Sequence, residues 1–189
     1  MTAYCDWCRT PAVTPIHAVH HATEHGIPPT TDNVLFARFC YEILQAGLSW
    51  DLILKRREGL HAVWHDFDVD MIAGISDSEL LAITTDPRNI RHRQKAFAIR
   101  ANACEFQALA RENGTACAWL YGQNTGEMQR VFRTHFKFAG PVITHEFLMG
   151  VGMLAGAHAS DCPCYATCIE AGAAWAVREG VVIPCRGGG

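Results

Sequence analysis

The chain has 189 residues, of which 49% are hydrophobic and 19% charged, with a formal net charge of −3. This length allows one well-packed domain, and the low charged fraction excludes a disordered chain. The longest apolar run free of charged residues and histidine, Phe147 to Ala157, is shorter than the roughly 20 residues of a membrane-spanning helix, so no membrane association is expected. The first residues lack a basic start followed by an apolar stretch, which predicts a cytoplasmic protein.

The first part of the core is predicted to be helical. Apolar residues recur at helical spacing over residues 31–46, and Thr31 is a suitable N-cap for this helix. Gly47 is its natural end. Ser49 then caps a second, short helix that extends through Leu54.

Helical signals continue along the rest of the chain. Ser76 and Glu79 form a capping box, a long helix is expected over about residues 90–112, and Pro141 opens a further helix. Only residues 181–183 have strand-like composition, and this run is isolated. The predicted fold class is therefore all-α.

Residue types that bind metals are concentrated at the two ends of the chain. The nine cysteines are many for this length, and in a reducing compartment such residues bind metal, react or are buried. Most of them lie near one end or the other: Cys5, Cys8, Cys162, Cys164, Cys168 and Cys185. We expect residues 1–30 and 155–189 to be irregular segments that a metal ties together beside a helical core at residues 31–154, all within one domain over residues 1–189.

Spacing alone leaves the ligand set open. His158 and Cys162 are four residues apart, which makes them neighbours if the segment is helical. Cys5 with His20 or His21 would complete a tetrahedral zinc site, closed to water and therefore structural. An alternative set is Cys5, Cys8, Cys162 and Cys164. Unligated buried thiols and surface histidines are a third interpretation.

Glu42 is a carboxylate in an apolar position. It continues the stripe formed by Leu35 and Phe39 on the first core helix. A carboxyl group facing an apolar pocket is desolvated, and its pKa rises. The alternative is a glutamate that points into water at the end of the helix.

Basic residues are unevenly distributed. Half of the 16 Lys and Arg residues lie between residues 55 and 100, which predicts one basic face on a slightly acidic protein. A turn that opens a helix beside basic side chains is suited to bind phosphate. A solvated helix face is the alternative interpretation.

Several sequence blocks resemble the 3-methyladenine DNA glycosylase I family, and they occur in the family's order. They cover roughly residues 4 to 165. The blocks are Glu42–Trp50, Leu54–Glu58, His65–Asp68, Ile90–Lys95, Phe136–Gly140 and His158–Tyr165.

The resemblance implies a helix-hairpin-helix fold with its hairpin near residues 86–95. It also implies a structural zinc whose ligands are Cys5, His21, His158 and Cys162. The family's catalytic, base-recognising positions correspond to Glu42, Trp50 and His20, and further base-pocket positions to Trp7 and His25. Its DNA-binding positions correspond to Gly47, Leu48, Arg88, Arg91, Arg93 and Lys95.

The implied activity is that of a monofunctional DNA glycosylase in base-excision repair. Such an enzyme hydrolyses the N-glycosidic bond of N3-alkylated adenine, or a related cationic purine, flipped out of double-stranded DNA. A monomer is expected, and no residue is indicated as a Schiff-base lysine.

Three positions depart from the family's pattern. Arg88 replaces the hairpin glycine, His20 a pocket tyrosine and His25 a tryptophan. These departures motivate an alternative: a relative that binds or excises a different or bulkier adduct, or only binds a nucleobase-like ligand. A zinc-stapled interaction protein without affinity for DNA is a third hypothesis.

Overall fold

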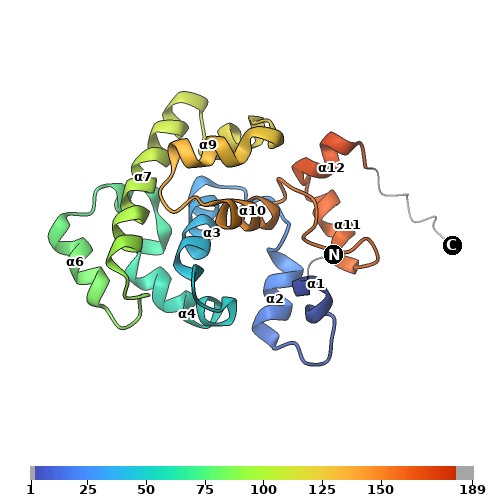
Figure 1. The fold of residues 1–189 in the computed structure, drawn as a ribbon, viewed down its shortest axis with the longest axis horizontal. Helices are drawn as coiled ribbons and strands as arrows, with labels where there is room; N and C mark the ends of the chain where they lie inside the picture. The colour runs from blue at the N-terminus through green and yellow to red at the C-terminus, as the bar shows by residue number, and fades with distance from the viewer. Residues whose placement is uncertain (1–2, 182–189) are drawn as a thin grey trace. The chain divides into compact units, whose positions relative to one another are not determined.

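The computed structural model describes residues 3–181. All regular elements in that range are helices (Figure 1), which confirms the predicted all-α class. The predicted strand-like run lies outside the described residues from residue 182 on, as does Cys185. Within the described range, no helix has the length and apolar content that a membrane span requires.

The chain forms two compact units. The first combines the residues up to Pro28 with those from Leu148 onward, and the second comprises Pro29 to Phe147. Both ends of the described chain therefore contribute to one unit, whose boundaries lie at Pro28 and Leu148.

Over the residues that the structure describes, the first unit contains four short helices, so the expectation of irregular terminal segments is wrong. Two of them begin with a proline at the first helical position, where the missing N–H is not needed. Burial of one face stabilises these segments, as with His17 and His21 on the second helix. The helices are α1 (Ala3–Cys8), α2 (Pro15–Thr23), α11 (Pro163–Glu170) and α12 (Ala174–Glu179).

In the second unit, the long helix α7 packs against α3, α5, α6 and α8 (Figure 1). A cluster of phenylalanines that includes Phe39, Phe106 and Phe136 forms part of its core. The helices are α3 (Asp32–Gln45), α4 (Trp50–Val63), α5 (Val69–Ala73), α6 (Asp77–Thr85), α7 (Arg93–Asn113), α8 (Ala116–Gly122) and α9 (Met128–His135). Short 3-10 turns lie at His65–Phe67 and Thr125–Glu127, and α10 (Pro141–Gly150) crosses the boundary between the units.

The helix α3 begins and ends where the sequence predicts. The Thr31 hydroxyl accepts a hydrogen bond from the Val34 amide, and the helix ends at Gln45. Gly47 then adopts a φ of +80°, which favours glycine. The next helix, α4, is longer than expected and continues to Val63, because Leu60 and Val63 extend its buried face.

The helices α6 and α7 with the turn at residues 86–92 form the hairpin. The Ser76 hydroxyl caps α6 by accepting from the Glu79 amide, as predicted. The α7 helix begins at Arg93, three residues later than expected, because the His92 side chain accepts from the Lys95 amide and caps it there.

Candidate metal centre and base-recognition site

The first unit brings together four metal-binding side chains from three separate parts of the sequence. One ligand atom from each of Cys5, His21, His158 and Cys162 lies within 4.8 Å of every other, and all four residues are buried. This is the set that the family resemblance implies, with His21 and not His20. His158 and Cys162 meet in a turn and not in a helix, since α11 begins only at Pro163.

The geometry of the cluster suits a tetrahedral ion. His21 Nε2 lies 3.0 Å from His158 Nδ1, and Cys162 Sγ lies 4.0 and 3.8 Å from these two nitrogens. Ligands around a tetrahedral zinc are roughly 3.3–3.8 Å apart, given the usual Zn–N and Zn–S lengths. The described donors can therefore hold a metal ion with little movement.

The second nitrogen of each ligand histidine also has a partner. His158 Nε2 donates to the His25 carbonyl oxygen at 2.7 Å, and His21 Nδ1 lies 3.7 Å from Cys164 Sγ. Such outer contacts fix the ring orientation and tautomer of a metal-bound histidine. Burial, together with neighbouring His158, lowers the pKa of His21 to about 4, so its imidazole is neutral, as metal binding requires.

A salt bridge between Arg9 and Asp161 also joins the two terminal parts of the chain within the first unit. The Arg9 guanidinium donates to both carboxylate oxygens of Asp161, at 3.0 and 2.9 Å. The pair is exposed and contributes little stability, but it brings the residues after α1 to the turn that carries His158 and Cys162.

Tyr4 and three histidines form a cluster next to the metal-binding residues. The Tyr4 hydroxyl lies 3.2 Å from His17 Nδ1 and 2.9 Å from His20 Nδ1, and its ring meets that of His25 edge-on. Trp7 in turn contacts the edge of His17, with ring centroids 4.8 Å apart. The predicted pocket residues Trp7, His20 and His25 thus share one cluster.

The second unit contains Glu42, near the end of α3. The residue is half-buried, and burial of its carboxyl, with a smaller contribution from neighbouring Glu146, raises its pKa to about 8. The group is therefore not in bulk solvent. It is a carboxyl group held in a desolvated position, as its place on the apolar stripe predicts.

The turn between α3 and α4 connects Glu42 to Trp50. Its backbone is fixed internally, since the Leu48 amide donates to the Gln45 carbonyl at 2.6 Å and the Gln45 side-chain amide donates back to the Leu48 carbonyl at 3.2 Å. Leu48 remains 38% exposed. Trp50 is half-buried and begins α4. The turn therefore presents an apolar side chain to solvent between the two residues.

Most of the basic residues near the hairpin are already engaged within the protein. Arg88 folds back on Asp86, to which it donates from Nε at 3.0 Å and from Nη2 at 2.7 Å, and these bonds lower the pKa of Asp86 to about 2. Arg56 donates to the carbonyls of Pro87 and Asn89. Arg91 and Arg93 are exposed, so these two are the side chains best placed to meet a phosphate.

Lys95 is expected on a DNA-binding surface, but the structure buries its side chain. It is only 4% exposed, and its ammonium donates to the carbonyl oxygens of Leu44 and Ala46, at 2.8 and 2.6 Å. A buried ammonium with two backbone acceptors is not available to a phosphate. The expectation that Lys95 contacts DNA is therefore corrected: within the second unit it contacts the end of α3.

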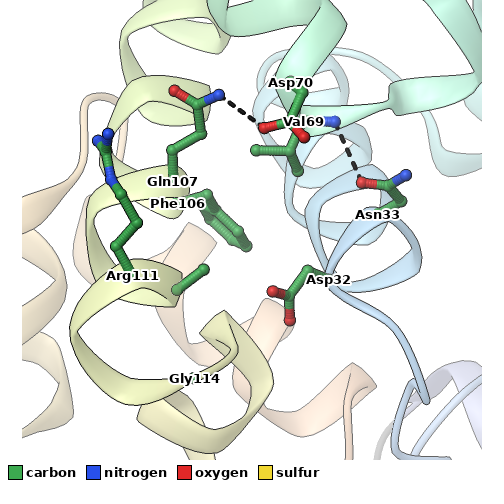
Figure 2. Close-up of a pocket in the computed structure, with 9 residues that line it drawn as sticks. Asp32, Asn33, Val69, Asp70, Phe106, Gln107, Arg111 and Gly114 are labelled. Carbon is green, nitrogen blue, oxygen red and sulfur yellow. Dashed lines mark hydrogen bonds between the residues drawn. The ribbon is translucent and has the colours of Figure 1, made fainter.

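A cavity of about 590 Å³ in the second unit contains none of these predicted residues (Figure 2). Asp32 accepts from the amides of Ala116 and Cys117, and Gln107 donates to Asp70. These hydrogen bonds join helices, which indicates a structural role for the polar groups. The lining residues are Asp32, Asn33, Val69, Asp70, Phe106, Gln107, Ala110, Arg111 and Gly114.

Sequence reasoning missed several residues that support the site. Tyr4 gave no signal, because a single tyrosine near a terminus has no characteristic spacing. Asn89 was also missed, although its buried amide accepts from Trp64 Nε1 and donates to the Ile83 carbonyl, which fixes the hairpin turn. A polar residue between Arg88 and Ile90, within an otherwise basic and apolar segment, was the only available hint.

The fold and these residues define a helix-hairpin-helix protein with an all-helical core, and the chain belongs to the methyladenine glycosylase family, whose sequence model matches residues 7–135. Among its relatives is DNA-3-methyladenine glycosylase 1 of Escherichia coli (strain K12), 28% identical over 184 residues, with 85% of this chain and 96% of the relative covered. The DNA-3-methyladenine glycosylase of Haemophilus influenzae is 29% identical over 186 residues, with coverage of 87% and 98%.

Solved structures show the same fold. A crystal structure of 3-methyladenine DNA glycosylase I is 29% identical with a TM-score of 0.72, and the match covers 85% of this chain and 98% of that one. The 3-methyladenine DNA glycosylase I from Staphylococcus aureus, in a structure describing 3-methyladenine recognition, is 24% identical with a TM-score of 0.74, at 86% and 97% coverage. The second match supports the fold alone.

Proposed function

We propose that this protein is a monofunctional DNA glycosylase of base-excision repair that removes N3-alkylated adenine from double-stranded DNA. The observation that carries the proposal is the desolvated carboxyl of Glu42, placed directly before the turn that leads to Trp50. The names of the Escherichia coli and Haemophilus influenzae relatives support the same substrate.

The first step is extrusion of the damaged nucleotide, since a base inside a duplex is out of reach. Leu48, exposed on the turn after Gly47, is suited to fill the gap that the nucleotide leaves. Arg91 and Arg93, exposed at the start of α7, are suited to contact the phosphates, together with the amides of the hairpin.

Recognition then depends on charge. Alkylation at N3 gives adenine a positive charge, which favours a carboxylate and an aromatic face over neutral surroundings. The Trp50 ring offers a cation–π contact worth about 2 kcal/mol when desolvated. Because the pKa of Glu42 is about 8, the cationic base is expected to displace its proton on binding. Trp7, His20 and His25 are proposed as further base-recognising side chains.

The cationic base is already a good leaving group and needs no general acid. The bond between C1′ and N9 breaks with its electron pair passing to the base, which leaves as the neutral purine. Water adds to the oxocarbenium-like sugar at C1′ and loses a proton to solvent. Lys95, whose ammonium is engaged by two carbonyls, does not provide a Schiff-base amine, so no strand cleavage is expected.

We further propose that Cys5, His21, His158 and Cys162 together bind a zinc ion. Four protein ligands leave no position for an activated water, so zinc would supply structure and not reaction chemistry. The protein is proposed to act as a monomer in the cytoplasm.

The test is release of 3-methyladenine from methylated duplex DNA, with the released bases identified. Glu42→Gln removes the negative charge and is expected to lower the excision rate by about 10²-fold or more, since a carboxylate stabilises the positive charge that passes from the base to the oxocarbenium-like sugar as the bond breaks. Glu112→Gln, an exposed carboxyl at the end of α7, is the matched control. Binding without base release by the wild-type protein would favour the non-catalytic alternative.

A further inference from the structure

Lys95 is a buried cation whose hydrogen bonds reach across the second unit. Its ammonium contacts the carbonyl oxygens of Leu44 and Ala46, which lie about 50 residues earlier in the sequence. These carbonyls belong to the end of α3, where the last backbone acceptors of a helix have no partner within it. A cation at this end is also favoured by the helix dipole.

The ammonium is held there at an energetic cost. Burial lowers the pKa of Lys95, and among residues 3–181 it forms no ion pair with a carboxylate. An apolar side chain of similar length would fill the same space without the desolvation penalty. The presence of an ammonium therefore points to the geometry that its two hydrogen bonds impose.

That geometry concerns the turn between the two proposed base-recognising residues. The bonds to Leu44 and Ala46 fix the backbone immediately after Glu42 and immediately before Gly47 and Leu48. Gly47 has the φ of +80° that reverses the chain, and a Cβ at this position would meet no other atom within 4 Å. Packing around Gly47 therefore does little to fix the path of the turn, which leaves that task to hydrogen bonds.

The other end of Lys95 belongs to the hairpin. It is the third residue of α7, and its amide donates to Nδ1 of the capping residue His92 at 3.3 Å. Arg91 and Arg93 lie on either side of that cap. One residue thus connects the segment proposed to bind phosphates with the turn proposed to enter the duplex.

We propose that Lys95 is a positioning residue that couples the hairpin to the base-recognition turn, so that phosphate binding at α7 places Leu48 and Glu42 correctly relative to the flipped base. The proposal rests on the proposed glycosylase function. It assigns Lys95 to the excision step and not to DNA affinity, because its ammonium faces backbone carbonyls and not solvent.

The experiment compares Lys95→Met, which has no donor, and Lys95→Arg, which retains charge and donors, with Lys137→Met, which removes an exposed cation. The first readout needs no activity. Amide hydrogen exchange of Ala46 and Leu48 is expected to accelerate at least about tenfold in Lys95→Met, as two charge-assisted hydrogen bonds are lost. Lys95→Arg is expected to restore part of the protection, and Lys137→Met to leave it unchanged.

The second readout separates binding from excision. The single-turnover excision rate at saturating enzyme is expected to fall by about 10²-fold in Lys95→Met, as for a small misplacement of a catalytic segment, while Kd for an uncleavable duplex changes by less than about threefold. A raised Kd with an unchanged excision rate would overturn the proposal in favour of a phosphate contact.

Two further outcomes are decisive. If Lys95→Met does not fold, Lys95→Gln, whose amide can donate to one carbonyl at a time, is expected to show the same changes to a smaller extent; unchanged exchange in that variant overturns the proposal. If the wild-type protein releases no base, the glycosylase function fails, and the exchange experiment still decides whether Lys95 fixes the turn.

Discussion

Two ionisable side chains of the second unit, Glu42 and Lys95, are held where their charged forms are disfavoured. Both are next to the same turn: Glu42 precedes it in the sequence, and the Lys95 ammonium contacts its backbone at Ala46. Among the described residues, no hydrogen bond to the Glu42 carboxyl offsets its desolvation, whereas the Lys95 ammonium is stabilised by two carbonyl oxygens. The acid is therefore the group whose protonation state a cationic ligand can change.

The raised pKa of Glu42 predicts how stability depends on pH. The pKa is about 8 in the folded protein and near the usual 4.5 after unfolding, so the folded state binds the proton more tightly. The stabilising contribution is fully present below pH 4.5 and is lost as pH rises to about 8. Urea unfolding from pH 5 to 8.5 is expected to show a steeper decline for wild type than for Glu42→Gln. Parallel pH profiles for the two proteins would contradict the assignment.

At the level of helices, capping residues and apolar spacing predicted α3 and the start of α6 well, because these signals act within one turn. The terminal helices α1 and α2 were missed, since their stability comes from burial against distant segments. The burial of Lys95 was missed for the same reason: its acceptors in α3 are remote in sequence. Local sequence patterns therefore predict most helices of the core, whereas contacts between residues remote in sequence determine which side chains remain accessible.

The turn before α7 packs against α4 at Arg88. The residue opposite Arg88 is Gly59: a Cβ added there would lie 3.1 Å from Arg88 Cβ and 3.4 Å from the Arg88 carbonyl oxygen. The glycine on α4 therefore makes room for the side chain on the hairpin.

This pairing predicts a coupled effect on stability. In the middle of a helix, Gly→Ala ordinarily stabilises by about 1 kcal/mol, but Gly59→Ala is expected to gain nothing or to destabilise, because of its contact with Arg88. In an Arg88→Gly background the same change is expected to stabilise by about 0.5–1 kcal/mol. Denaturant unfolding of the four proteins in a double-mutant cycle measures the coupling. If the two substitutions change the free energy of unfolding additively, the contact between position 59 and Arg88 does not affect stability, and the prediction is wrong.

Across the whole molecule, the proposed functional residues are divided between the two units. The first unit contains the proposed metal ligands and the proposed pocket residues His20 and His25, and the second contains Glu42, Trp50 and the hairpin. Within the first unit, the proposed metal ligands and the proposed pocket residues are neighbours along the chain or are joined by a hydrogen bond. His20 precedes His21 in the sequence, and His158 donates to the His25 carbonyl. A metal there would order the aromatic cluster as well as the chain ends.

Loss of the metal is therefore expected to affect the first unit before the second. Cys162→Ser, or treatment with a chelator, should lower Tm by about 5–10 °C and should shift the imidazole NMR signals of His17, His20 and His25 together towards the values of an unstructured chain. Hydrogen exchange at α7 amides should change little. Cys104→Ser, an exposed thiol on that helix, serves as the control and should retain one bound zinc by native mass spectrometry. A Cys162→Ser protein with wild-type Tm and metal content would show that these four residues do not form the metal site.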